Sequence, residues 1–188
     1  MTAIIDYKAG NLTSVKLAFA ALGAEAVVTS DPKVIAAADR VVFPGVGAAK
    51  SAMENLRAFG LVEPVKEAAA TKPFLGICLG MQILFDHSEE DGGVDCLGII
   101  SGNVRRFPTV PGFKVPEIGW NGVEGLDGKE FYFVHSYYAE KGPYTLGMTE
   151  YAGVEFSSAV RRGNLLATQF HPEKSGRLGL SLLQSFLH

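Results

Sequence analysis

One short stretch, residues 73–82 (PFLGICLGMQ), constrains the fold of this chain more than any other. Its apolar start predicts a buried strand, which turns sharply at Cys78 with Gly76 and Gly80 two residues to either side. Glycine at these positions permits tight backbone packing at a bend, and the layout is that of a nucleophile elbow. A helix predicted over residues 81–86 would direct its N–H groups and positive end toward the thiol and favour the thiolate. A small apolar cysteine in a packing turn fits this stretch alone about equally well.

A second motif, Gln-Phe-His-Pro-Glu at residues 169–173, favours the catalytic interpretation. Residues 164–170 predict a strand that ends at His171, which Pro172 keeps extended because α conformation is disfavoured before proline. In an extended chain, residues two apart share a face, so the Glu173 carboxylate can orient the His171 imidazole. A cysteine nucleophile, a histidine base and a carboxylate that orients the base form a triad, which only the fold can assemble here.

Several segments together resemble the class I (triad) glutamine amidotransferases and, among them, the glutaminase subunits of imidazole glycerol phosphate synthase. The segments are GICLGMQ at 76–82, HPE at 171–173, PGVG at 44–47, DYKAGN at 6–11 and KVPEIGWN at 114–121. The resemblance extends over essentially the whole chain. One departure is Glu117, where the family more often has histidine. It leaves the triad untouched, and the resemblance does not determine the details of the nearby surface.

The resemblance implies hydrolysis of the glutamine side-chain amide to glutamate and ammonia through a cysteine thioester, with Cys78, His171 and Glu173 as the triad. The tetrahedral intermediate needs two N–H donors, for which we expect Leu79 and the glycine loop before the third helix. The loop candidates are Val46 and Gly47. The resemblance also assigns glutamine binding to Gly45, Gln82, Ser136 and Tyr137.

Free ammonia is lost to water, so a glutaminase of this kind needs a synthase docked over its site. We expect no second domain in this chain, and the resemblance implies a separate cyclase subunit, a (β/α)8 barrel of histidine biosynthesis, in a heterodimer. The matching interface positions are Asn11, Pro116, Trp120, Asn121 and Lys174. From the sequence alone, Trp120 is about equally consistent with an interface anchor and with a buried core residue.

Composition narrows the class of protein. The 188 residues are 47% hydrophobic and 20% charged, which suits one soluble domain, residues 1–188. A formal net charge of −3 gives no electrostatic case for nucleic acid or a membrane surface. Two cysteines make no disulfide framework, Cys96 is expected to be a small buried hydrophobe, and a reducing cytoplasm is the expected compartment. No cofactor or metal is indicated.

The order of elements predicts an α/β fold of flavodoxin-like, three-layer type. Strands near residues 3–6, 24–29, 40–43 and 73–78 alternate with helices near 12–22, 48–59 and 61–70 and with a short helix that begins at Pro32 and is capped by Asp31, which indicates a mostly parallel sheet. After residue 95 the pattern changes to a mixed or antiparallel half with turn glycines such as Gly125 and Gly128. Its predicted strands are 98–107, 117–123, 130–138, 144–151, 154–162 and 164–170, followed by a final helix from residue 176.

Other interpretations remain open at this stage. His135 shares a strand face with Phe131 and Phe133 and is expected to be a hydrogen-bonded core or rim histidine, while His87 and His188 are given no role. The triad could serve another synthase, such as that of pyridoxal phosphate or anthranilate, or a cysteine peptidase. A binding module without activity and a zinc site of Cys, His and Glu are less consistent with three filled triad positions.

Overall fold

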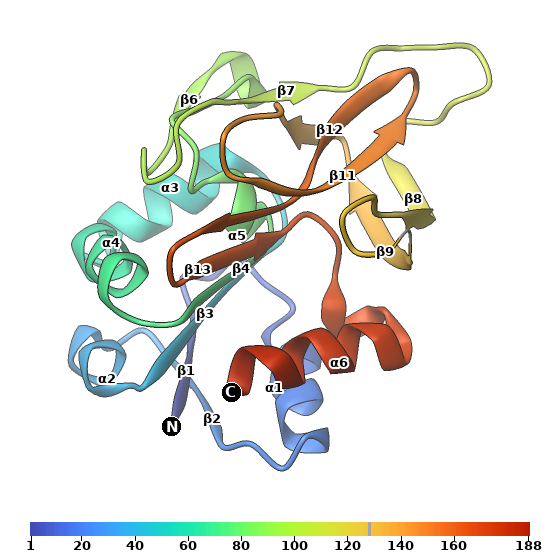
Figure 1. Ribbon diagram of the computed structural model, residues 1–188. Coiled ribbons are helices and arrows are strands. Elements are labelled where there is room, and N and C mark those ends of the chain that lie inside the picture. The colour runs from blue at the N-terminus through green and yellow to red at the C-terminus, as the bar shows by residue number, and fades with distance from the viewer. Residues whose placement is uncertain (128) are drawn as a thin grey trace.

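The computed structural model describes residues 1–127 and 129–188, arranged as a large sheet with helices on both faces (Figure 1). Gly128, one of the predicted turn glycines, lies outside the described residues. The helices are α1 (Leu12–Ala21), α2 (Pro32–Ala37), α3 (Ala49–Ala58), α4 (Val62–Thr71), α5 (Leu79–Gln82) and α6 (Gly176–Leu187), with 3-10 turns η1 (Glu90–Gly92) and η2 (Pro172–Lys174). The strands are β1 (Thr2–Ile5), β2 (Ala26–Thr29), β3 (Arg40–Gly45), β4 (Phe74–Cys78), β5 (His87–Ser88), β6 (Val94–Asp95), β7 (Asn103–Arg106), β8 (Glu117–Gly122), β9 (Glu130–His135), β10 (Tyr137–Ala139), β11 (Thr145–Tyr151), β12 (Val154–Arg162) and β13 (Leu165–Thr168).

The sheet has a parallel half and a mixed half. β2, β1, β3, β4 and β13 are neighbours in that order, and each pair is parallel. The sheet continues through β12, β10, β7, β5 and β6, with β11 also on β12, and these pairings are antiparallel except for β5 with β7. The predicted mostly parallel α/β sheet with a mixed C-terminal half is therefore confirmed.

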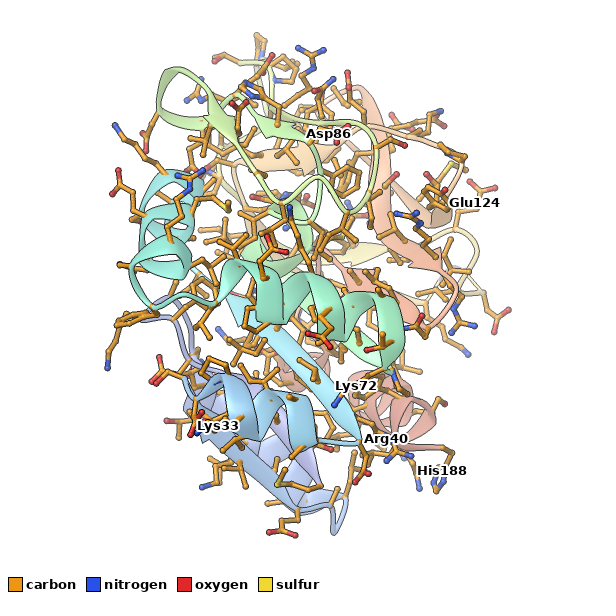
Figure 2. The ribbon with its side chains drawn as sticks, turned by 90° about the vertical axis from the view of Figure 1, so that its left-hand side faces the viewer. Lys33, Arg40, Lys72, Asp86, Glu124 and His188 are labelled. Atoms are coloured by element: carbon orange, nitrogen blue, oxygen red, sulfur yellow. The ribbon has the colours of Figure 1, made fainter. Side chains whose placement is uncertain are left out.

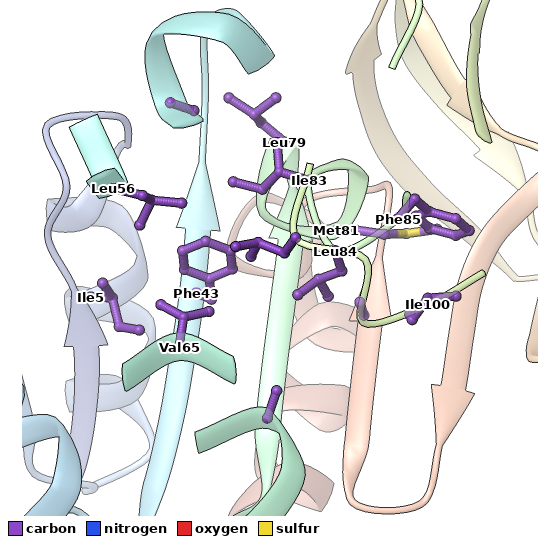
Figure 3. Close-up of a cluster of buried hydrophobic side chains, with 14 of the residues drawn as sticks. Ile5, Phe43, Leu56, Val65, Leu79, Met81, Ile83, Leu84, Phe85 and Ile100 are labelled. Carbon is purple, nitrogen blue, oxygen red and sulfur yellow. The ribbon is translucent and has the colours of Figure 1, made fainter. Parts of the chain in front are cut away.

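Alternate residues of the parallel strands supply two apolar cores, one on each face of the sheet. Ile4 packs in a cluster with Leu183 of α6, whereas Ile5 and Phe43 pack in a cluster with Leu56 of α3. Figure 3 shows Ile5, Phe43 and Leu56 gathered on that second face. Full burial of such a side chain contributes roughly 1.5–3 kcal/mol, so both helical layers are held firmly on the sheet.

Helix α2 is capped at both ends. At its N-terminus, the Asp31 side chain accepts a hydrogen bond from the Lys33 N–H at 2.8 Å, as predicted for a cap. At its C-terminus, the Lys72 ammonium donates to the carbonyls of Ile35 and Ala38 at 3.3 and 2.7 Å. Figure 2 shows Lys33 and Lys72 near the two ends of this helix. The Lys72 contacts join the end of α4 to α2 and so fix the outer layer.

Two predicted strands differ in the structure. The predicted strand 130–138 is wrong as one element, because it breaks at Ser136. β9 pairs with β8 in a separate two-stranded sheet, here called the β8–β9 ribbon, and β10 joins the large sheet. The predicted strand 98–107 is reduced to β7. The N–H groups of residues 96–100 instead donate to the carbonyls of residues 83–86.

The helices of the described residues have at most 12 residues. A bilayer needs a helix of about 20 residues, so none of these could cross a membrane.

Candidate active site

Cys78 occupies a strained turn between β4 and α5. Its backbone has φ 55° and ψ −114°, and residues other than glycine rarely adopt a positive φ. The neighbouring glycines are needed for close packing. A Cβ on Gly76 would lie 2.9 Å from Cβ of Ala167, and one on Gly80 would collide with the Phe43 carbonyl. The geometry agrees with the predicted elbow.

The helix after the elbow is shorter than the predicted span of 81–86, which is wrong. α5 covers only Leu79–Gln82. The reason is the same set of hydrogen bonds that shortened β7: residues 96–100 take up the carbonyls of residues 83–86, so those carbonyls cannot continue the helix. The elbow therefore presents the free N–H groups of one helical turn to the sulfur rather than the dipole of a long helix.

His171 and Glu173 form a buried pair. His171 Nδ1 lies 2.8 Å from Glu173 Oε1, and the two side chains are only 2% and 1% exposed. His171 is extended, as predicted from Pro172, but β13 ends earlier, at Thr168. Glu173 lies in the 3-10 turn η2 rather than in extended chain, so the turn and not strand alternation brings the carboxylate under the ring.

Parallel pairing of β4 with β13 brings the two motifs together. Ala167 pairs with Gly76 and Thr168 with Ile77, so both strands run toward the same edge of the sheet. Cys78 and His171 then line one cavity of about 290 Å³, here called the Cys78 cavity. The cavity lies beyond the carboxyl ends of parallel strands, where open α/β sheets bind ligands.

The sulfur and the imidazole lie together without a formed hydrogen bond between them. The Cys78 Sγ is 3.9 Å from the Val134 carbonyl, and Nε2 of His171 is buried with no hydrogen-bond partner among the described residues. Burial lowers the pKa of His171, but Cys78 and Glu173 outweigh it and raise the pKa to about 10. The ring is therefore held as an imidazolium, and catalytic contacts commonly tighten only when substrate binds.

The remaining walls of the Cys78 cavity contain most of the predicted substrate-binding positions. Gln82 is buried, and its amide donates to the Tyr137 carbonyl at 2.7 Å. The N–H groups of Val46 and Gly47 make no hydrogen bond with the described residues. Gly45 ends β3 and lies beneath this loop rather than in the cavity wall. The complete lining is Val46, Gly47, Cys78, Leu79, Gln82, Glu90, Pro116, Val134, His135, Ser136, Tyr137 and His171.

Sequence reasoning missed two residues of the site. Glu90 lines the cavity, where burial raises the pKa of its carboxyl and the Ala49 N–H donates to it at 2.6 Å. It stands in an acidic turn with no local signal of function. Gln169 is fully buried and donates to the Cys78 Sγ over 3.7 Å. Its place two residues before His171 in the same motif was a usable signal.

The five predicted interface positions differ in how far they are exposed. Trp120 is 55% exposed, so the buried-core alternative is wrong, and Pro116 lines the Cys78 cavity. Lys174 is exposed, with its ammonium 5.9 Å from the Tyr132 ring. Asn11 is half-buried beside the triad.

Asn121, the remaining interface position, has its side chain turned inward. Its amide donates to Glu117 Oε1 at 3.0 Å and to the Glu150 carbonyl at 3.1 Å. Glu117 itself is only 3% exposed and contacts His135, so the departure at this position lies in the interior. His135 is a hydrogen-bonded interior histidine, as predicted.

No cluster of three or more His, Cys, Asp or Glu side chains suited to a metal ion occurs among residues 1–127 and 129–188. The triad instead offers a thiol and an imidazole at a cavity that could take a small polar molecule, with a carboxylate bonded to the far side of the imidazole. That arrangement supports nucleophilic attack on a carbonyl group.

Comparison with known proteins gives a consistent result. Residues 3–188 match the family model of glutamine amidotransferase class-I. The chain is 50% identical to "Imidazole glycerol phosphate synthase subunit HisH" of Dehalococcoides mccartyi (strain CBDB1), covering 99% of this chain and 96% of the relative. The subunit of the same name from Methanothermobacter thermautotrophicus is also 50% identical, covering 100% and 98%. A solved structure described as a glutamine amidotransferase has a TM-score of 0.76 at 22% identity, over 98% of this chain and 96% of that one, which shows the fold alone.

Proposed function

The chain belongs to the class I glutamine amidotransferases, and on this basis we propose that it is the glutaminase subunit of an imidazole glycerol phosphate synthase. It hydrolyses glutamine to glutamate and ammonia and passes the ammonia to a cyclase subunit for histidine biosynthesis. Residues 1–188 form a single glutaminase domain in this proposal, and a reducing cytoplasm suits its reactive thiol. The observation that carries the proposed chemistry is that Cys78 and His171 line one cavity while the Glu173 carboxylate lies 2.8 Å from Nδ1 of His171.

The reaction begins at the thiol. The Cys78 proton already resides on His171 in a thiolate–imidazolium pair, and the thiolate attacks the side-chain amide carbon of glutamine. The imidazolium then gives its proton to the amide nitrogen, the C–N bond breaks and ammonia leaves, with the acyl group held as a thioester. Water attacks the thioester as His171 takes up its proton, and the C–S bond breaks to release glutamate. Glu173 holds the ring in place and stabilises its charged form throughout.

The negative oxygen of each tetrahedral intermediate is stabilised by backbone donors. Leu79 is the first residue of α5, so its N–H has no acceptor within the helix. Val46 and Gly47 supply the second N–H from the loop on the other wall of the cavity. Removal of one such donor costs on the order of 10²–10³ in kcat in other enzymes of acyl transfer.

Glutamine is held by the cavity walls. The Ser136–Tyr137 backbone and the Gln82 amide supply polar contacts, and Gly45 shapes the loop floor. Glu90, which the sequence did not predict as a substrate-binding residue, offers its carboxylate to the positively charged α-amino group of glutamine. Its partial burial makes such a contact strong because the surrounding water is sparse.

The partner docks over the mouth of the Cys78 cavity. Glu117 to Gly122 form β8, whose outward residues Ile118 and Trp120 are 63% and 55% exposed. Pro116, directly before this strand, lines the cavity. Exposed apolar side chains at a cavity rim mark an interaction site. A cyclase subunit with a (β/α)8 barrel would bury Trp120 and meet Lys174, Asn11 and the backbone near Asn121, closing the route by which ammonia escapes.

The test is glutamate release from glutamine by the purified chain alone, with the barrel subunit, and with the barrel subunit and its phosphoribosyl ligand. We expect stimulation by the partner. Cys78→Ser should lower the rate by on the order of 10³ or more, because the attacking thiolate is lost. Cys96→Ser is the matched control, since burial raises the pKa of that thiol to about 11 and it lies outside the cavity. No turnover with the partner, or cleavage of peptides instead, would refute the proposal.

A further inference from the structure

His135 is held between two hydrogen-bond acceptors. Its Nδ1 lies 2.8 Å from the Tyr137 carbonyl oxygen and its Nε2 lies 2.9 Å from Glu117 Oε2. The side chains of His135 and Glu117 are only 2% and 4% exposed, so water does not mediate or replace these contacts. Both ring nitrogens therefore face oxygen atoms in the interior.

These contacts fix the number of protons in the pair. A backbone carbonyl can only accept, so Nδ1 must carry a hydrogen. The Nε2–Oε2 contact also needs one proton, carried either by the ring or by the carboxyl group. In both forms the Glu117–His135 pair is electrically neutral as a whole, which is the condition under which two ionisable groups can be buried together.

The faces of the His135 ring are surrounded by aromatic side chains. The His135 ring packs against Phe107, Phe133 and Phe156, with centroids 5.2, 5.6 and 5.3 Å away. A hydrogen bond in such surroundings is stronger than one in water, and its loss leaves a costly unpaired group.

The Glu117–His135 pair holds the bend at Ser136 and Tyr137, here called the Ser136–Tyr137 corner, which forms part of the wall of the Cys78 cavity. The chain leaves the β8–β9 ribbon at His135 and enters the large sheet at Tyr137, with Ser136 at the change of sheet. The bond from His135 to the Tyr137 carbonyl closes this corner across two residues. The same carbonyl accepts from the Gln82 amide at 2.7 Å, so one oxygen joins the corner to the cavity wall.

The contacts continue to the nucleophile. Gln82 also donates to the Gln169 side-chain oxygen at 2.9 Å, and Gln169 donates to the Cys78 sulfur at 3.7 Å. At the other end, the second Glu117 oxygen accepts from Asn121 at 3.0 Å, so neither carboxylate oxygen is unpaired. The network therefore runs without a gap from β8 to the sulfur.

We propose that Glu117 is a positioning residue for the glutaminase reaction: with the proton it shares with His135, it holds the Ser136–Tyr137 corner in the geometry that binds glutamine. The inference deepens the proposed function, because it names what orients the substrate-binding backbone. Glu117 acts through His135 on the backbone that binds glutamine. Its loss should therefore weaken substrate binding more than it slows the attack by the sulfur.

The test compares Glu117→Ala with the conservative Glu117→Gln in the complex with the barrel subunit. Glu117→Ala leaves Nε2 of His135 unpaired and loosens the corner, so KM for glutamine should rise about tenfold with kcat changed less than threefold. Glutamine at this position can donate its amide hydrogen to Nε2 of a neutral ring and still accept from Asn121, so Glu117→Gln should recover KM to within about threefold of the unchanged protein. Labelling of Cys78 by iodoacetamide, which does not use the glutamine corner, should stay unchanged in both variants.

A spectroscopic measurement on the chain itself needs no activity. In protein labelled with 15N-histidine, His135 should give two proton signals that exchange slowly with water. One comes from the N–H at Nδ1 and the other from the proton in the hydrogen bond between Nε2 and Glu117. Glu117→Ala should lose the second signal. The proposal is overturned if KM does not change in a folded Glu117→Ala variant, if Glu117→Gln behaves like Glu117→Ala, or if no protected proton is seen in the hydrogen bond between Nε2 of His135 and the Glu117 carboxyl group. If the protein without substitutions lacks glutaminase activity, the proposed function is refuted instead. The spectroscopic result then still decides whether Glu117 and His135 share a proton.

Discussion

Gln169 and Cys78, 91 positions apart in the sequence, are joined by a hydrogen bond from the Gln169 amide to the Cys78 sulfur over 3.7 Å. The oxygen of the same amide accepts from Gln82. One buried side chain therefore contacts both the nucleophile and a wall of the substrate cavity, and its chemistry bears directly on the reaction.

Replacement of Gln169 should separate the effect of its hydrogen bonds from that of its volume. Gln169→Leu keeps the size but removes both bonds, and kcat/KM for glutamine should fall about tenfold, or about 1.4 kcal/mol. Gln169→Glu places a carboxylate against the sulfur and should cost more, because negative charge opposes the thiolate. Steady-state glutamate release with the partner subunit measures both. Full activity of Gln169→Glu would contradict the role given to this amide.

The stability of the chain should depend on pH through His171. The pKa of this ring is raised from 6.5 to about 10, so the folded state keeps a proton that the unfolded chain releases. The stabilisation is complete below pH 6.5 and is lost as pH rises toward 10, with a slope of at most about 1.4 kcal/mol per pH unit.

Urea unfolding of the unchanged chain and of His171→Gln from pH 6 to 9 tests this. The difference in free energy of unfolding between the two should shrink as pH rises. His188→Gln serves as the control, because His188 is exposed, and it should follow the unchanged chain. Parallel curves for the unchanged chain and His171→Gln would show that the imidazolium is not stabilised in the fold.

Trp120→Ala should weaken binding of the barrel subunit without affecting the thiol. An exposed aromatic residue at the centre of an interface typically contributes about 2 kcal/mol, so affinity should fall on the order of 10- to 100-fold. Titration calorimetry measures the affinity, and alkylation of Cys78 tests the thiol. Phe59→Ala is the matched control, because Phe59 is 42% exposed directly after α3, far along the chain from β8. Equal affinities for the two variants would rule out this face as the docking site.

Gly80→Ala should destabilise the fold at the elbow. A Cβ at this position would meet the Phe43 carbonyl, so β3 or α5 must move, at a cost of at least about 2 kcal/mol. Gly142→Ala is the control, since nothing lies within 4 Å of the added carbon and its φ is not positive. Thermal unfolding compares the two. A Gly80→Ala protein as stable as Gly142→Ala would mean that the elbow is loosely packed.

The sequence was sufficient for those parts of the structure that local pattern determines. The parallel half and the turn at Cys78 followed from apolar runs and glycine spacing, and the extended His171 followed from Pro172, whereas the 3-10 turn that carries Glu173 did not. What it could not supply depends on contacts between distant segments. The α5 helix is short because residues 96–100 compete for its carbonyls, and the strand at 130–138 divides at Ser136 because its two halves join different sheets.

In the candidate site, too, the features that the sequence did not predict depend on contacts between distant segments. Glu90 gave no signal, since an acidic turn is usually solvated and only the fold turns this carboxyl into the cavity. Asn121 was expected at the partner interface from the resemblance, but its side chain bonds inward to Glu117, which in turn contacts His135. Alternation along β8 could have suggested this, had the side that faces the core been known.

The two-residue alternation of β8 has a further consequence. Glu117 and Asn121 point to the interior, whereas Ile118 and Trp120, on the other side of the same six-residue strand, point to solvent. Selection for a different partner can therefore act on one set of side chains while the other set continues to maintain the glutamine site. A single short strand thus gives this protein two separately adjustable surfaces.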